Sequence, residues 1–223
     1  MFQLKNERIV EVESHDYGGS LILPWFGLRK PSTAYYTSNL NIYPFIISQI
    51  TRFGAQHKLL LYDERASGKD ADSLCSLRFQ HYINMYIQDR DLKKLHLRPK
   101  FLFVILDNCV GQNKSQYVLM LFAALTVLGF YERIILHFLE SGHSHGCPDI
   151  GFAHAKSHLN EEVYIPQQMK DLMNTVEGIQ AEVVDFNDFE SDEYPFRVGW
   201  GPLFAKYFTR IPALQGSLLN FHF

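Results

Sequence analysis

The sequence predicts an α/β fold with a mixed central sheet flanked by helices. Three segments with the composition of strands, at residues 8–16, 34–47 and 57–64, precede the first segment with a helical pattern. Helical and strand patterns then alternate, as they do where helices connect the strands of one sheet. With 223 residues, a mass of 25.9 kDa, 18 Phe and 12 Tyr, the chain can bury one sizeable core of this kind.

The opening strands are indicated by their composition and by the turns beside them. Residues 8–16, RIVEVESHD, suggest a strand that runs into Asp16, and the tight YGGS turn follows at once. AYYTSNLNIYPFII at 34–47 is rich in aromatic and β-branched residues, which favours one half of a hairpin. HKLLLYDE at 57–64 predicts a short buried strand that ends in acids.

The rest of the predicted core alternates helix and strand. Asp70 suits the N-cap of a helix, and the continuous run FLFVIL at 101–106 predicts a central strand covered on both faces. Ser115 can cap a second helix, apolar almost all round, which Gly129 ends as the C′ residue. The remaining elements are a strand at 133–139, a helix from Pro148 through Leu159, a helix from Pro166 to near Gly178 and a strand at 181–186.

This order of elements is the layout of the ribonuclease H-like fold. In that layout the first and fourth strands lie side by side at the centre of the sheet. We therefore predict a ribonuclease H-like core at residues 1–186, followed by a C-terminal extension at 187–223 that could be truncated.

Composition narrows the class of protein. The formal net charge of −3 and a pI near 6.4 show no global basic footprint, which counts against a domain that grips DNA tightly by itself. Cys75, Cys109 and Cys147 form no CxxC pair and are typical of reduced thiols inside the cell. No secretory signal opens the chain, and the longest apolar run, 117–130, is too short to span a bilayer. We expect a soluble, intracellular protein without a membrane partner.

Three acids could form one metal site if the predicted layout holds. Asp16 ends the first strand, Asp107 directly follows the fourth, and Asp149 stands at the start of a later helix. Neighbouring carboxylates repel unless a cation lies between them, and hard divalent ions prefer oxygen ligands. The three acids are therefore candidate catalytic and metal-binding residues of a two-metal Mg²⁺ or Mn²⁺ site. Taken singly, the acids could instead be a turn former, an Asx turn or helix cap, and a first-turn helix acid, in that order.

The loop after Asp107 could bind a backbone phosphate. It is not a Walker A sequence, but Asn108, Gln112, Asn113 and Lys114 offer donors at a helix N-terminus. The alternative is a polar loop exposed to water. A mild basic cluster could touch a nucleic-acid backbone or form a solvated helix end; it comprises Lys93, Lys94, His96, Arg98 and Lys100.

A histidine-rich segment suggests a different metal. His154 and His158 have the i, i+4 spacing that places two imidazoles on one helix face, as in zinc hydrolases. The segment lacks HExxH, and two surface histidines on a helix are usually uncommitted. Further candidate ligands for zinc are His143, His145, Asp149, Cys109 and Cys147.

Two longer strings carry a family resemblance. LDNCVGQNKSQYVLMLFAAL and ILHFLESGHSHGCPDIGFAHAKSHL resemble an uncharacterised, transposon-associated eukaryotic domain with DNC-x-GQNK and GH(S/T)-x4-D-x2-F motifs. HDYGGSLILPWFG, YYTSNLNIYPFII and YDERASGKDADSLCSL are similar to its earlier landmarks, so the resemblance covers about residues 14–165. That family looks like a DDE-type transposase or integrase core.

The resemblance implies a metal-dependent enzyme that cleaves or transfers DNA strands in the nucleus. Its acids would be the same three aspartates, and its GH motif adds His143, which could position the scissile phosphate or the attacking water. Homo-oligomerisation stays open. The competing hypotheses are a domesticated or inactive transposase-derived binding domain and a zinc hydrolase. The acidic balance, and a chain that begins almost at the first strand without a separate DNA-binding module, favour the former.

Overall fold

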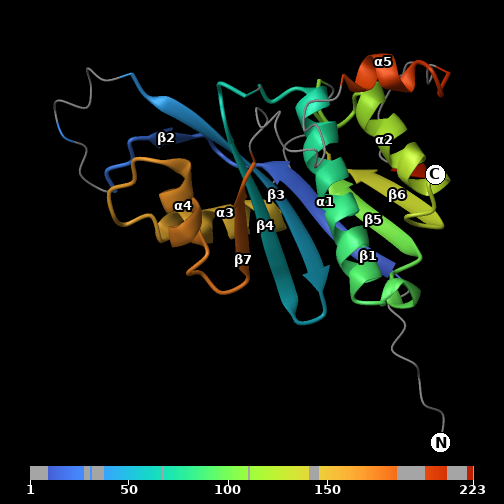
Figure 1. Ribbon diagram of the computed structural model, residues 1–223, viewed down its shortest axis with the longest axis horizontal. Coiled ribbons are helices and arrows are strands. Elements are labelled where there is room, and N and C mark those ends of the chain that lie inside the picture. Colours follow the sequence, from blue (N-terminus) through green and yellow to red (C-terminus); the bar gives the residue numbers. More distant parts are fainter. Residues whose placement is uncertain are drawn as a thin grey trace, which may run out of the picture.

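The fold is a mixed β-sheet with helices on both faces (Figure 1). The computed structural model describes residues 10–27, 31, 38–66, 68–109, 111–140, 146–184 and 199–209, and the backbone of 220–222. The sheet has the strand order β7-β4-β3-β1-β5-β6-β8, and β2 pairs with β3. The strands are β1 (Val10–Tyr17), β2 (Leu21–Leu23), β3 (Leu40–Thr51), β4 (Gly54–Asp63), β5 (Phe101–Leu106), β6 (Arg133–Phe138), β7 (Ile179–Val183) and β8 (Asn220–His222).

Strand β1 lies at the centre of this sheet. It pairs antiparallel with β3 and parallel with β5, so the predicted pairing of the first strand with the FLFVIL strand is confirmed. β3 and β4 form a long antiparallel hairpin, and β5 pairs parallel with β6. At the two edges, β7 pairs parallel with β4 and β8 pairs antiparallel with β6.

Three predicted helix caps are confirmed, whereas α4 ends at Met173 and not near Gly178 as predicted. Asp70 accepts a hydrogen bond from the Ser73 N–H (2.8 Å), and Ser115 accepts one from the Val118 N–H (3.3 Å). Gly129 follows the second helix with a φ of 79°, in the left-handed region that glycine adopts at no cost. The helices are α1 (Ala71–Asp91), η2 (Leu95–Leu97), α2 (Gln116–Val127), α3 (Cys147–Ser157), α4 (Pro166–Met173) and α5 (Trp200–Phe204).

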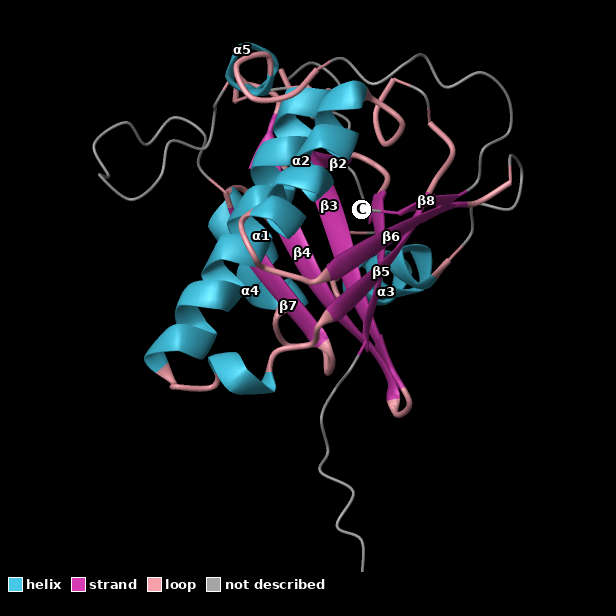
Figure 2. Cartoon of the chain, turned by 90° about the vertical axis from the view of Figure 1, so that its right-hand side faces the viewer, coloured by secondary structure: helices cyan, strands magenta, loops and turns pink. Residues whose placement is uncertain are grey.

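Two hydrophobic cores hold the layers together. α1, α2 and α5 cover one face of the sheet, where Leu102, Val104 and Leu106 of β5 are fully buried. α3 and α4 pack on the other face, where Phe152 and Met169 join a separate buried cluster. Figure 2 shows α1 and α2 on one side of the sheet and α3 on the other. Among the described residues, no helix has the length and apolar character needed to cross a membrane.

The structure differs from the predicted elements in several places. β5 is buried on the α1 face only, because no described helix lies over Phe101, Phe103 and Ile105, which are half-buried. β2, α5 and β8 were not predicted, since all three are short. α5 and β8 belong to the same layered unit as the core, although they come from the predicted extension. Residues 8–9, 34–37 and 185–186 of three predicted strands lie outside the described residues.

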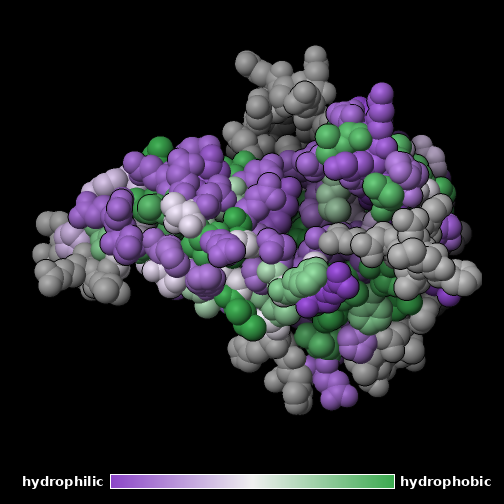
Figure 3. Space-filling model, turned by 90° about the horizontal axis from the view of Figure 1, so that it is seen from below, coloured by the Kyte–Doolittle hydropathy of each residue, from purple (hydrophilic) through white to green (hydrophobic). Residues whose placement is uncertain are grey.

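The surface is uneven in polarity. Seen from below, polar side chains dominate the left of the molecule and hydrophobic side chains gather on the right (Figure 3). Exposed apolar side chains include Phe53 at the β3–β4 turn and Val127 at the end of α2.

Candidate metal centre

The register of β1 and β5 places Asp16 and Asp107 side by side at the carboxyl ends of these two strands. In the parallel pair of β1 and β5, His15 lies opposite Leu106. The residue after His15 is Asp16, and the residue after Leu106 is Asp107. His15 and Leu106 are buried on the α1 face, and side chains alternate between the faces of a strand. Asp16 therefore belongs to the α3 face, and Asp107 follows directly after the end of β5.

Helix α3 supplies the third acid from the opposite layer. Asp149 lies in its first turn, and its carboxylate accepts a hydrogen bond from the Gly146 N–H (2.9 Å) as the acid of a capping box. α3 packs on β1, β3 and β4 through small residues. A Cβ on Gly18 would lie 2.9 Å from the Phe152 ring, and a Cβ on Gly151 would lie 2.4 Å from His57 Nδ1. The two glycines thus allow α3 to approach the sheet.

The pKa of Asp16 responds to the charges of the other two aspartates. Burial raises the pKa of Asp16 to about 6, and the negative charges of Asp107 and Asp149 add to the rise. The hydrogen bond from the Tyr17 N–H (2.7 Å) and the charge of Arg78 act in the opposite direction. Ionised Asp16 is therefore destabilised unless a cation comes between the acids.

Each carboxylate is held by a local donor. Asp16 accepts from the Tyr17 N–H, Asp107 from the Asn113 side-chain amide and Asp149 from the Gly146 N–H. Among the described residues, no three His, Cys, Asp or Glu side chains are close enough as they stand to hold a metal ion. Carboxylates are nevertheless the oxygen ligands that Mg²⁺ and Mn²⁺ prefer.

The loop after β5 is built around Asn113. This residue is only 3% exposed, its Oδ1 accepts from Arg78 and its amide N–H donates to Asp107. We predicted it as a donor to a substrate phosphate, but burial and these two bonds commit its amide to Asp107. Asn108, directly after Asp107, is half-buried.

The other predicted substrate-binding residues lie on the same loop. Gln112 donates to the Lys69 carbonyl (3.0 Å), which ties the loop to the segment before α1. The Lys114 ammonium lies 5.1 Å from the centre of the Phe138 ring. Phosphate binding by these side chains stays a prediction. His143 lies outside the described residues.

Lys69 is a cation at the rim that the sequence did not reveal. Its Nζ donates to the Gly18 carbonyl (3.3 Å) and lies over the rings of Tyr17 and Tyr43, at 5.2 and 5.1 Å. Burial lowers the pKa of Lys69, whereas the charge of Asp16 opposes that change. The GKD string carries no signal that separates this lysine from a surface lysine.

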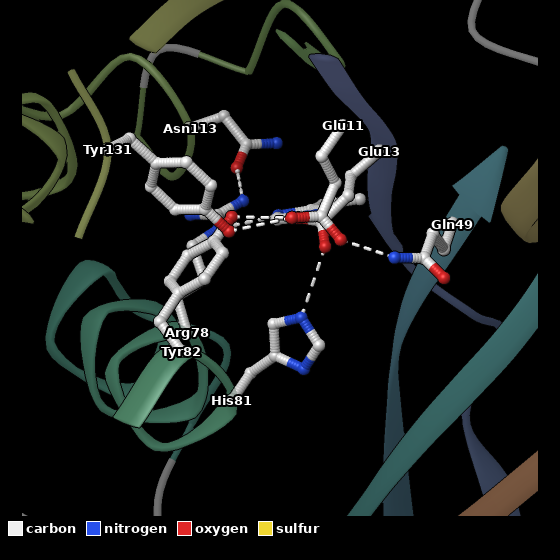
Figure 4. A network of polar contacts seen from close by, with 9 residues as sticks. Glu11, Glu13, Gln49, Arg78, His81, Tyr82, Asn113 and Tyr131 are labelled. Carbon is white, nitrogen blue, oxygen red and sulfur yellow. Dashed lines mark hydrogen bonds and ion pairs between the residues drawn. The ribbon is translucent and has the colours of Figure 1, made fainter. Parts of the chain in front are cut away.

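A network of buried polar side chains lies between β1 and α1 (Figure 4). Glu13 is fully buried and accepts hydrogen bonds from His15 (2.9 Å), His81 (3.2 Å) and the Tyr82 hydroxyl (2.8 Å). Burial raises the pKa of Glu13, but the bonds from His15 and His81 outweigh it and hold the pKa well below its ordinary value. Glu11 accepts from the Tyr131 hydroxyl (2.8 Å) and from Gln49.

Sequence reasoning missed this network, although a signal was present. In VEVESHD, the polar residues Glu11, Glu13 and His15 recur at every second position. That spacing places them on one face of a strand. In a central strand this face is buried, so charged residues there must find partners.

The histidines of the zinc hypothesis lie on α3. His154 and His158 are exposed, with ring centroids 5.4 Å apart. Cys109 and Cys147 are half-buried free thiols. No described group of potential ligands gathers around them, and His143 and His145 lie outside the described residues. The described part of the chain therefore lends the zinc hypothesis no support.

A pocket of about 380 Å³ lies between α1 and the strands β3, β4 and β7, at the other end of the sheet. Its lining includes Glu13 and His81 of the buried network, and none of the three aspartates. The pocket is therefore separate from the candidate metal centre.

These features define a mixed α/β protein. Two aspartates lie at the ends of its central strands β1 and β5, and a third lies in the first turn of α3. The chain matches the family described as Domain of unknown function (DUF7869) over residues 69–192. Because this match covers more than half of the chain, the protein belongs to that family. The matched region includes Asp107 and Asp149 and begins after Asp16. Searches of curated proteins and of solved structures returned no match.

Proposed function

We propose that this chain is a DDE-type transposase or integrase-like core that cleaves or transfers DNA strands with Mg²⁺ or Mn²⁺. The observation that carries the proposal is the register of β1 and β5, which sets Asp16 beside Asp107, while the charges of Asp107 and Asp149 both raise the pKa of Asp16. The three acids come from β1, the end of β5 and the start of α3, so only the fold unites them. A carboxylate whose pKa is raised both by burial and by specific charged neighbours is a candidate for a functional site.

The strand order supports a ribonuclease H-like fold. Within the sheet, β4-β3-β1-β5-β6 has β3 antiparallel to its neighbours and β1, β5 and β6 parallel. The resemblance to a transposon-associated domain agrees with this fold. DNA is then the expected partner and the nucleus the expected location.

The roles of the residues follow from their positions. Asp16, Asp107 and Asp149 would hold two divalent ions, which activate the attacking oxygen and stabilise the leaving oxygen of a phosphodiester. Lys69 and Lys114 would offset the charge of the substrate phosphate at the rim of the centre. Asn108 and Gln112 offer polar groups on the same loop, and His143 would orient the phosphate or the attacking water.

Asp107→Asn tests the proposal directly. Loss of a ligand should remove several kcal/mol of transition-state stabilisation, which corresponds to a roughly 10²–10⁴-fold slower metal-dependent DNA cleavage. Asp91→Asn is the matched control, because Asp91 ends α1 with a side chain that is 62% exposed. Circular dichroism should show that both variants stay folded. Equal cleavage by Asp107→Asn and the parent would refute the catalytic proposal.

A non-catalytic, transposase-derived binding domain is the second candidate. It is favoured by the local hydrogen bond that each aspartate already accepts and by the net charge of −3. The two candidates differ in metal binding. Weak Mn²⁺ binding that is lost in Asp16→Ala supports the enzyme, whereas DNA binding with no divalent-ion binding supports the binding domain. Stoichiometric zinc in the purified protein would instead support the zinc hydrolase.

A further inference from the structure

Arg78 is the most deeply buried cation that the structure describes. It projects from α1 and is 0% exposed, with its guanidinium between the rings of Phe45 (5.2 Å) and Phe122 (5.7 Å). Nε donates to His15 Nδ1 (3.2 Å), and Nη2 donates to Asn113 Oδ1 (2.5 Å). Two rings and two hydrogen bonds therefore fix the plane of the guanidinium.

His15 connects Arg78 to the buried carboxylate of Glu13 by two hydrogen bonds. Because His15 Nδ1 accepts from Arg78, its proton is on Nε2, which donates to Glu13 (2.9 Å). A buried charge needs such hydrogen bonds, since an unpaired one costs several kcal/mol.

On its other side, Arg78 is linked by hydrogen bonds to the candidate metal centre. Arg78 donates to the side-chain carbonyl oxygen of Asn113. The amide nitrogen of Asn113 therefore faces Asp107 and donates to its Oδ1. Reversing the Asn113 amide would set an N–H against the guanidinium and an oxygen against a carboxylate. Arg78 therefore determines which group Asn113 offers to Asp107.

We infer that Arg78 is a positioning residue that, through Asn113, orients the Asp107 carboxylate for a divalent cation. The inference rests on the proposed metal centre. Donation to Oδ1 holds the carboxylate plane and leaves Oδ2 for a cation. Outer partners of this kind set ligand orientation, and their loss typically weakens metal binding 10–100-fold. His15 and Glu13 continue these hydrogen bonds on the inner side of Arg78.

The test is a double-mutant cycle on Mn²⁺ affinity, with Arg78→Lys, Asn113→Ala and the double variant titrated calorimetrically. Lysine keeps the positive charge and much of the volume, but it lacks the planar guanidinium whose two nitrogens donate to His15 and to Asn113 at once. We expect Mn²⁺ to bind roughly 10-fold more weakly to each single variant. Because Arg78 acts through Asn113, the double variant should bind no more weakly than Asn113→Ala alone.

Arg98→Lys is the matched control. Arg98 is also buried, lies over the rings of Tyr86 and Tyr131, and pairs with Asp89 (2.8 Å) at the far end of α1. It has no connection to Asp107, so this substitution should destabilise the fold and leave Mn²⁺ affinity unchanged. Comparable loss of Mn²⁺ affinity in the control would show a general effect of destabilisation and overturn the inference.

The side-chain amide signals of Asn113 provide a readout that needs no metal. In the metal-free parent, its two N–H resonances should differ strongly in shift and exchange slowly. In Arg78→Lys they should move towards the values of a free amide. Unchanged Asn113 signals in Arg78→Lys would overturn the inference.

The metal titrations separate the inference from the proposed function. Unchanged Mn²⁺ affinity in Arg78→Lys, or losses that add in the double variant, would overturn the positioning role alone. Absence of Asp107-dependent Mn²⁺ binding in the parent would instead overturn the proposed function, together with the metal part of this inference.

Discussion

Replacing Asp16 with asparagine should make the metal-free protein more stable at pH 7, although Asp16 belongs to the candidate metal centre. Its pKa is raised from an ordinary 3.8 to about 6, first by burial and then by Asp107 and Asp149. Folding at pH 7 therefore places an ionised carboxylate where the neutral form is preferred. Asparagine removes the charge and keeps an oxygen that can accept from the Tyr17 N–H (2.7 Å).

The size of the effect follows from the two pKa values. A difference of about 2 corresponds to at most about 3 kcal/mol between the folded and unfolded states. Asp16 is only half-buried, and screening by water reduces the expected gain to about 1–2 kcal/mol. When the pKa of an acid is higher in the folded state, its neutral form stabilises the fold. This contribution to the free energy of unfolding is complete below the unfolded-state pKa and is lost as the pH rises through the folded-state pKa. The advantage of Asp16→Asn should therefore grow from about pH 4 to about pH 6 and stay constant above.

Urea unfolding in the presence of EDTA, at pH 4 and pH 7, measures this difference. Asp171→Asn is the control, because Asp171 is an exposed residue of α4 that pairs with Lys170 (3.1 Å). Added Mn²⁺ should reverse the order of stability at pH 7, since the parent alone keeps all three ligands. An Asp16→Asn variant that is less stable than the parent at pH 7, or equally stabilised at both pH values, would refute the reasoning.

Two further predictions concern the network and the placement of α3. Glu13→Ala should lose about 3–5 kcal/mol in urea unfolding because it leaves the buried donors of His15, His81 and Tyr82 without their acceptor, whereas Glu13→Gln should lose about 1–3 kcal/mol; equal losses would argue against the carboxylate as the shared acceptor. Gly151→Ala should cost about 1–3 kcal/mol and weaken Mn²⁺ binding, since its Cβ would lie 2.4 Å from His57 Nδ1. The same change at Gly111, where a Cβ meets nothing within 4 Å, should leave stability unaffected, and a similar cost at both glycines would contradict this explanation.

Local signals determined most of the elements. The caps at Asp70, Ser115 and Gly129 depend on side chains and backbone conformations within a few residues of the helix ends, so they can be found in the sequence. The order of strands and helices also predicted that β1 and β5 would be parallel neighbours, which places Asp16 beside Asp107. Short elements such as β2 and α5 carry too few residues for a periodic pattern.

The partners of the buried polar residues could be found only in the tertiary structure. The sequence placed Glu13 in a strand but could not show that α1 would set His81 and Tyr82 against it. Asn113 belongs to a loop that is polar in composition, yet contacts from α1 bury it and aim its amide at Asp107. Hydrogen bonds between residues far apart in the chain depend on how the layers pack, and that packing has no local signature. By itself, therefore, the sequence determined which acids could meet at the sheet edge, and only the tertiary structure decided what holds Asp107 there.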